Sequence, residues 1–253
     1  MKNDSEDFHT SYQNLATQMK ARAEKDGDAY LPNIKPIGPV DYVFIGMEPS
    51  LGKWARTADE ARSKVDAGFC NFTTSIEDFI LHFCIQHYLC GHEQRYHLTD
   101  LLKGAMLVNN AAIDRTERYD RWFELLLAEI DVVAPGAEVF AVGNAVKQQL
   151  ERRHFSKPFT QVMRYSPLAS RARKAGIVGL EDSFEAFRRT MNLDAVLGLA
   201  EVVLDAAVPN VFRDETLKRL GKKKHLTASQ HMLIFNYRLA FDAVKARQAP
   251  EIA

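Results

Sequence analysis

The sequence is poor in several features that would indicate particular classes of protein. It has only three cysteines among 253 residues and no signal-peptide pattern, so a reducing, cytoplasmic location is expected. No apolar run approaches the roughly 18 residues that indicate a membrane-spanning helix. No glycine-rich nucleotide motif, internal repeat or low-complexity tract is present, and no cofactor is expected. The chain also lacks net charge, because 33 Lys and Arg residues balance 33 Asp and Glu residues. Any binding to nucleic acid must therefore come from local basic patches.

What the sequence does have is a regular alternation of strand and helix patterns. Short β-favouring apolar runs predict strands at Val40–Ile45, in "YHLTDLL" ending near Thr99, at Ala137–Gly143, and from Phe159 onward. Amphipathic spacing predicts helices over Tyr12–Lys25, Ser75–Leu89, Arg118–Ala134 and "NAVKQQLERRH". Ser75 with Asp78 three positions later is a helix-start signal. Alternating strands and helices predict an α/β fold, a three-layer α/β/α sandwich around a mainly parallel four-stranded sheet.

The C-terminal part of the chain has a different pattern. Residues 1–183 are expected to form the α/β domain with its N-terminal helix, and residues 184–253 a helical extension packed on it. The extension carries a basic loop, Lys218–His225. A solvated turn between helices and a phosphate-contacting patch both explain this loop.

Polar residues follow the predicted strands. In parallel α/β sheets ligands bind beyond the carboxyl ends of the strands. Glu48, Asp100, Gly143 and Arg164–Ser166 all fall at such ends. The first of these loops reads Gly46-Met47-Glu48-Pro49, an acid on a segment stiffened by proline. Without further motifs, this pattern predicts that Glu48 is a surface acid at the end of a strand.

Four motifs in order make the sequence resemble the uracil-DNA glycosylase superfamily over about half of the chain, Val40 to Arg173. They are Gly46-Met47-Glu48-Pro49, "LTDLLKGAM" with Asp100 and Lys103, "PGAEVFAVGNAVKQQL", and "RYSPLASRAR". In that superfamily the first loop carries a water-activating acid or amide and the second strand ends in a base-reading residue. The last loop binds phosphate and wedges the duplex.

The resemblance implies roles for individual residues. It makes Glu48 the group that stabilises an oxocarbenium-like sugar and activates water, as in glycoside hydrolysis. Phe69 or Phe72 would stack on a flipped base, although a core role explains each equally well. Leu168 would be the wedge. The resemblance also implies that the substrate is contacted by Gly46, Met47 and Ser50. It implies contacts with DNA by Lys103, Ser166, Ser170, Arg171 and Arg173.

Two departures from the family pattern suggest the substrate. Asp100 stands where the uracil enzymes have asparagine. An ionised carboxylate accepts from the N4 amino group of cytosine but meets a lone pair on O4 of uracil. Ser50 stands where the strict uracil enzymes have a tyrosine that blocks substituents at C5. Together these departures favour a 5-substituted cytosine, such as the glucosylated hydroxymethylcytosine of phage DNA, and an anti-phage role. A helix-capping role for Asp100 is the alternative.

The third departure is Arg164, which stands at the family's histidine position. Arginine stabilises charge on the leaving base electrostatically but does not act as a general acid near neutral pH. A phosphate contact is the alternative role. The cluster Cys84, His87, Cys90, His92 and His97 does not have the spacing of a zinc site. Three cysteines cannot supply the four ligands of the iron–sulfur cluster present in some branches, so no cluster is expected.

Three functions remain open from the sequence. The first is a monomeric DNA glycosylase acting on a flipped, modified cytosine. The second keeps uracil as the base in DNA repair, with Asp100 misassigned. The third is a catalytically inactive member that binds DNA; Glu48 argues against it, because binding alone needs no acid there.

Overall fold

In the computed structural model, the residues described are 2–49, 55–91, 93–105, 115–166, 169–207 and 211–248. The chain divides into two compact units. The first, here called the sheet unit, comprises Met1–Asn71, Gln94–Gln161 and Ala207–Val211. The second, the helical unit, comprises Phe72–Glu93, Val162–Ala206 and Phe212–Ala253. This division differs from the predicted boundary at residues 183 and 184, because two segments from the predicted α/β domain cluster with the C-terminal helices.

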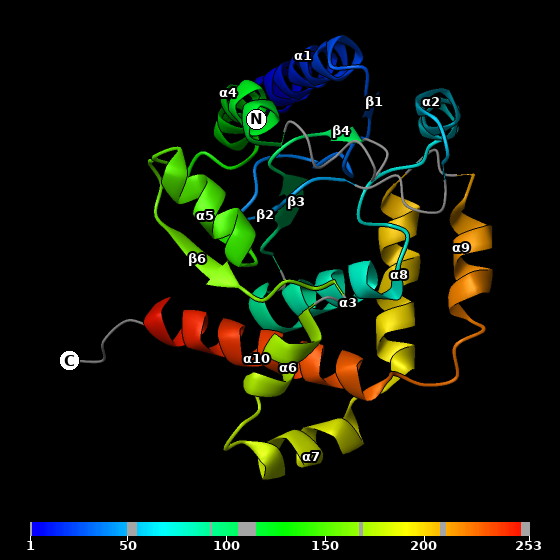
Figure 1. Cartoon of the computed structure of the whole chain (residues 1–253), viewed down its shortest axis with the longest axis vertical. Helices are drawn as coiled ribbons and strands as arrows, with labels where there is room; N and C mark the ends of the chain where they lie inside the picture. Colours follow the sequence, from blue (N-terminus) through cyan, green and yellow to red (C-terminus); the bar gives the residue numbers. More distant parts are fainter. Residues whose placement is uncertain are drawn as a thin grey trace. The chain divides into compact units, whose positions relative to one another are not determined.

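The sheet unit is built on a four-stranded sheet with the order β3-β2-β5-β6 (Figure 1). These strands are β2 (Tyr42–Gly46), β3 (Tyr96–Asp100), β5 (Glu138–Val142) and β6 (Phe159–Val162). β2 pairs in parallel with β3 and with β5. The α/β class, the four strands and the parallel pairing are therefore confirmed.

Helices of the same unit cover one face of this sheet. They include α1 (Lys2–Lys25), α4 (Arg115–Val133) and α5 (Asn144–Arg152), while α2 (Ala58–Asp66) and the short antiparallel pair β1 (Ala29–Tyr30) and β4 (Gly104–Ala105) lie elsewhere in the unit. Side chains alternate along a strand, so Val43 and Ile45 of β2 pack with Trp122 and Ile130 of α4 in one core cluster. On the opposite face, Phe44 and Phe140 stack with ring centroids 4.5 Å apart.

The helical unit contains α3 (Ile76–Cys84), the π-helix η1 (Ile85–Leu89), α6 (Ser170–Ala175), α7 (Glu181–Thr190), α8 (Leu193–Ala206), α9 (Arg213–Leu220) and α10 (Ala228–Gln248). The predicted capping box is confirmed: Ser75 Oγ accepts from the Asp78 amide, and the Asp78 carboxylate accepts from the Ser75 amide. The predicted helix Ser75–Leu89 changes to a π-helix in its second part. Within the described residues, no helix combines the length and hydropathy needed to cross a membrane.

Candidate active site

Two neighbouring strands of the sheet unit end beside each other. Gly46, the last residue of β2, is in register with Asp100, the last residue of β3. A Cβ atom on residue 46 would clash with Oδ1 of Asp100. Glycine at this position therefore has a packing reason, since only a bare α-carbon leaves room for the carboxyl group.

Asp100 lies in a nearly closed environment. Its residue is 4% exposed, and Nδ2 of Asn71 donates to its Oδ2 at 2.6 Å. Asn71 is itself fixed, because its backbone amide donates to the carbonyl of Pro32 at 2.8 Å. The carboxyl group is thus held between a glycine α-carbon on one side and an amide donor on the other.

Beside Asp100 lies a buried ionic cluster that includes Lys103. The Lys103 ammonium donates to Oε2 of Glu129 at 2.8 Å, to the Asp100 carbonyl at 3.2 Å and to the Thr99 hydroxyl. His97 Nε2 lies 3.0 Å from the other Glu129 oxygen. Lys103 is only 2% exposed, so its predicted contact with DNA is wrong. A buried ammonium group needs hydrogen-bond acceptors, and the Lys103 ammonium finds its acceptors inside the protein.

These surroundings separate the pKa values of the two buried carboxyl groups. Burial raises the pKa of Asp100 to about 7; the Glu48 and Glu129 charges add to this, while Lys103 and Asn71 act against it. Burial would also raise the pKa of Glu129, but Lys103 and His97 outweigh it and lower that pKa to about 2. Near neutral pH, Asp100 therefore exists in both protonation states, and Glu129 is ionised.

Glu48 lies just beyond the end of β2 and is half-buried. The hydroxyl of Tyr119, on α4, donates to Oε2 of Glu48 at 3.1 Å. The guanidinium of Arg153 lies 5.6 Å from the centre of the Tyr119 ring. Since the Glu48 charge influences the pKa of Asp100, the two carboxyl groups are close enough to interact. The site therefore pairs a buried carboxyl group with a more accessible one.

The two aromatic residues predicted to stack on a base are both buried. Phe69 belongs to the sheet unit and Phe72 to the helical unit. Phe72 has a φ of 59°, unusual for a bulky residue, and its carbonyl lies 3.1 Å from His82 Nε2. The burial favours core packing for both, and stacking on a base stays a prediction. Ser50 and Leu168, the predicted C5 neighbour and wedge, lie outside the described residues.

The predicted phosphate loop belongs to the helical unit, where Arg173 has a structural role. Arg173 is 1% exposed, and its guanidinium donates to the carbonyls of Tyr165 and Ser166 at 2.6 and 2.8 Å and to Ser229 Oγ at 2.8 Å. A direct phosphate contact by Arg173 is therefore wrong. Its buried donors instead connect the loop to α10.

The other predicted residues of this loop differ in exposure. Arg164, Ser170 and Arg171 are exposed, as a phosphate contact requires. Ser166 is half-buried, and its Oγ atom has no hydrogen-bond partner among the described residues.

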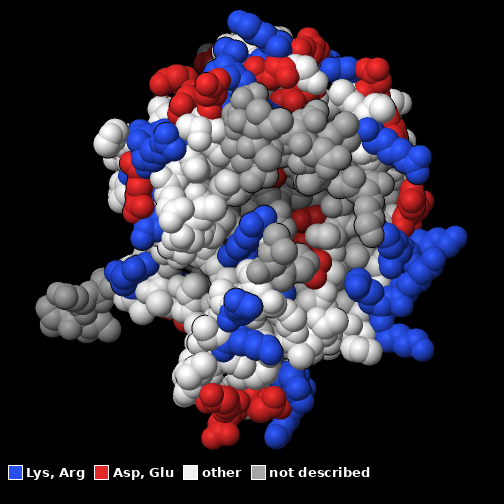
Figure 2. Space-filling model, in the orientation of Figure 1, with Lys and Arg blue, Asp and Glu red and all other residues white. Residues whose placement is uncertain are grey.

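A second basic surface of the helical unit follows α9. Lys218, Arg219 and Lys222–Lys224 are exposed, and Figure 2 shows Lys and Arg side chains gathered at the right edge of the view, over α9 and the loop after it. Both the solvated-turn and the phosphate-contact interpretations of this loop require exposure. Among the described residues, no group of three or more His, Cys, Asp or Glu side chains is arranged to hold a metal ion.

Three residues of the site were not found from the sequence: Asn71, Tyr119 and Glu129. Asn71 lies in the stretch "AGFCNFTTS", where no pattern distinguishes a buried hydrogen-bond donor from an ordinary loop asparagine. Tyr119 is three residues from Trp122, a helical spacing that marks the buried face of α4 but does not reveal a contact with Glu48. Glu129 is a charged residue on that same buried face, which is the one available signal of a buried ion pair.

Comparison of the chain with protein-family models, with curated proteins and with solved structures finds no match in any of the three.

Proposed function

We propose that this protein is a DNA glycosylase that cleaves the N-glycosidic bond of a flipped pyrimidine nucleotide. The observation that carries the proposal is the pair Glu48 and Asp100 at the adjoining ends of two parallel strands. The same strand ends carry the motifs that resemble the uracil-DNA glycosylase superfamily, and the α/β fold with its parallel strands is compatible with that superfamily. The four-stranded sheet is also compatible with the three-layer arrangement expected from the sequence.

In the proposed reaction, Glu48 acts at the sugar. The bond between C1′ and the base nitrogen breaks, its electron pair leaves with the base, and water adds to C1′. The Glu48 carboxylate stabilises the positive charge on the sugar and accepts a proton from the attacking water. The hydrogen bond from Tyr119 fixes one carboxylate oxygen. Because Glu48 is half-buried, its carboxylate is accessible to a substrate and is also partly shielded from bulk water.

Asp100 reads the base in this proposal. An ionised Asp100 accepts from N4 of cytosine, which supports a cytosine base as substrate. Ser50, in place of the family's tyrosine, supports a substituent at C5, and glucosylated hydroxymethylcytosine in phage DNA is the best candidate. Arg164 is proposed to stabilise the charge of the leaving base, with a DNA phosphate as the alternative partner. The biological role proposed on this basis is defence against phage.

One observation favours a second base. With a pKa of about 7, Asp100 is protonated in part at neutral pH, and a protonated carboxyl group donates to O4 of uracil. Uracil repair is therefore retained as the second candidate function. The two candidates differ in pH dependence: release of cytosine should rise with pH as Asp100 ionises, whereas release of uracil should fall over the same range.

The deciding experiment uses oligonucleotides that carry uracil, cytosine, hydroxymethylcytosine or glucosylated hydroxymethylcytosine at one position. After incubation with the protein at pH 6, 7 and 8, alkali-labile abasic sites are scored. Release of a 5-substituted cytosine with poor release of uracil supports the proposal. Efficient uracil release alone would reassign the substrate, and no abasic site from any oligonucleotide would contradict the enzymatic function.

A further inference from the structure

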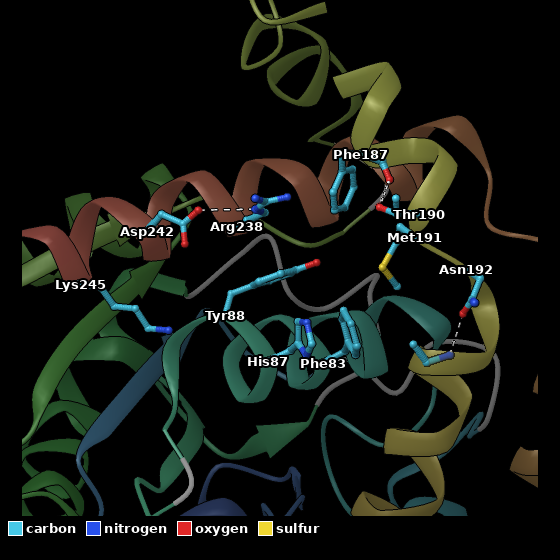
Figure 3. Close-up of a pocket in the computed structure, with 11 residues that line it drawn as sticks. Phe83, His87, Tyr88, Phe187, Thr190, Met191, Asn192, Arg238, Asp242 and Lys245 are labelled. Carbon is cyan, nitrogen blue, oxygen red and sulfur yellow. Dashed lines mark hydrogen bonds and ion pairs between the residues drawn. The ribbon is translucent and has the colours of Figure 1, made fainter. Parts of the chain in front are cut away.

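A cavity of about 770 Å³ lies within the helical unit and contains no residue of the proposed glycosylase mechanism. Its volume is within the range of about 300–1,000 Å³ that is typical of small-molecule sites. The cavity is bordered by the end of α3, by η1, by the junction of α7 and α8, and by α10 (Figure 3). The residues that matter for its chemistry are Phe83, His87, Tyr88, Arg238, Asp242 and Lys245.

The π-helix η1 supplies two consecutive residues to this cavity. In η1, His87 and Tyr88 both line the cavity. π-Helical turns are rare, and many of those known lie at functional sites, so the presence of η1 beside the cavity favours a functional role for the cavity.

The aromatic rings of this segment form an ordered arrangement. The rings of Phe83 and His87 are stacked, with centroids 5.1 Å apart and planes 14° from parallel. The Tyr88 ring stands nearly perpendicular to both, at 89° to Phe83 and 82° to His87. In Figure 3 the Tyr88 ring lies between this stacked pair and Arg238 of α10. Its flat side therefore faces α10, where a planar ligand can stack on it.

The opposite wall of the cavity is charged. Arg238, Asp242 and Lys245 follow each other at helical spacing on α10, so they share one face of that helix. Arg238 Nε lies 3.5 Å from a carboxylate oxygen of Asp242, and its guanidinium lies 5.8 Å from the centre of the Phe187 ring. Lys245 is exposed and forms no ion pair with another described residue. Two cations and one acid give this wall a net positive charge.

We propose that this cavity binds a nucleotide, with the base stacked on Tyr88 and the phosphate at Lys245 and Arg238. A planar aromatic face beside cations is the combination by which proteins hold nucleotides without reading their sequence. Arginine is suited to this because it stacks on rings and binds phosphate with fixed donors. Asp242 forms an ion pair with Arg238 and so helps to hold the guanidinium on this wall of the cavity. The nucleotide is either free or part of an unpaired DNA strand.

Calorimetric titrations with four probes test this proposal. The probes are dAMP, deoxyadenosine, inorganic phosphate and a 5′-phosphorylated single-stranded oligonucleotide. We expect dAMP to bind more tightly than deoxyadenosine or phosphate, because only dAMP offers both the ring and the charge. Tyr88→Leu should weaken dAMP binding at least about fivefold, the lower end of base–aromatic stacking. Lys245→Gln should weaken the binding of dAMP and leave that of deoxyadenosine unchanged.

Arg247→Gln is the matched control, because Arg247 is an exposed cation on the same helix that does not line the cavity. Equal weakening of oligonucleotide and dAMP binding by Tyr88→Leu identifies a DNA strand as the source of the nucleotide, and weakening of dAMP binding alone identifies a free nucleotide. The proposal is overturned if dAMP does not bind with a dissociation constant below about 1 mM and Tyr88→Leu leaves oligonucleotide binding unchanged. Equal effects of Lys245→Gln and Arg247→Gln would also overturn it. Loss of glycosylase activity in other experiments would not affect these results, since the two sites share no residue.

Discussion

At the scale of single residues, Asp100 is the group whose charge state matters most. Its carboxyl group is buried beside Gly46, receives one hydrogen bond from Asn71 and lies near two other carboxyl groups. The consequence is a pKa of about 7, against an ordinary value of 3.8. Proteins use the surroundings of a carboxyl group to tune its pKa for an acid or base role, and burial has this effect on Asp100.

The raised pKa of Asp100 predicts how folding stability depends on pH. The folded state favours the protonated form, so the stabilisation is fully present below about pH 4 and is lost as pH rises through about 7. The difference in unfolding free energy between wild type and Asp100→Asn should therefore fall between pH 4 and pH 8. Urea unfolding at several pH values measures it. Burial also lowers the pKa of His82 to about 4. The contribution of His82 to stability is the same in both proteins, so it cancels in the difference between them. A difference independent of pH would contradict the described environment of Asp100.

Tyr119 is expected to position Glu48. Its hydroxyl donates to Glu48 at 3.1 Å, and the Tyr119→Phe variant keeps the ring and removes only that hydrogen bond. Base release should fall by at least about tenfold, because a hydrogen bond to a charged group is worth about 1.5–3 kcal/mol and about 1.4 kcal/mol is a factor of ten in rate.

The matched control for Tyr119 is Tyr42→Phe, which removes a hydroxyl at the opposite end of β2. In the background of Glu48→Gln, adding Tyr119→Phe should cause no further loss, because both changes act on the same interaction. Additive losses in this cycle would show that Tyr119 affects activity through the fold instead.

At the scale of elements, α6 is the clearest case of two arginines with different roles. Arg171 is exposed, whereas Arg173 is buried and bound to the carbonyls of Tyr165 and Ser166. Arg171→Ala should reduce the slope of log affinity against log salt by about one unit, the effect of one lost phosphate contact. Arg173→Ala should instead lower the melting temperature, because it removes the buried guanidinium that donates to the carbonyls of Tyr165 and Ser166.

Filter binding of DNA at several salt concentrations and thermal unfolding separate these two effects. Lys174→Ala is the matched control, an exposed cation on α6. If Arg171→Ala leaves the salt slope unchanged, the phosphate contacts lie elsewhere, and the exposed Lys222–Lys224 segment is the next surface to test. If Arg173→Ala changes the slope without changing stability, the structural role given to Arg173 is wrong.

The elements themselves could be predicted from the sequence because their signals are local. The strand β2 was predicted at Val40–Ile45 and lies at Tyr42–Gly46, and the helix predicted at Arg118–Ala134 lies at Arg115–Val133. Continuous apolar runs and helical periodicity carry this information. The pair β1 and β4 was missed, since two-residue strands have no periodicity. The π-helix was missed because its apolar pattern continues that of α3.

The candidate site was predictable only in part. Glu48 and Asp100 follow strands, and parallel pairing aligns strand ends, so their proximity follows from topology. Burial of Lys103 and Arg173 depends on partners distant in sequence, Glu129 and Ser229. A charged residue in a sequence is expected at the surface, and only the tertiary contacts show that these two are exceptions.

At the scale of the whole molecule, the chain combines one unit built on a sheet with one built from helices. The sheet unit holds the two carboxyl groups proposed for chemistry and base reading. The helical unit holds the exposed Arg164 and Arg171, the basic surface after α9, and the cavity proposed to bind a nucleotide. With zero net charge, binding to DNA in this account depends on such local surfaces, and affinity should fall steeply with salt.

The central claim is that Glu48 performs glycosidic bond cleavage, and one comparison tests it most directly. The rate of base release from an oligonucleotide with glucosylated hydroxymethylcytosine is measured for wild type, Glu48→Gln and the exposed control Glu124→Gln, together with DNA affinity. Wild type and Glu124→Gln should release the base equally fast. Glu48→Gln should be slower by at least about tenfold with affinity within a few-fold, because positioned acid–base groups contribute about 10²–10⁴-fold to a rate. Full activity of Glu48→Gln would remove Glu48 from the mechanism and contradict the account.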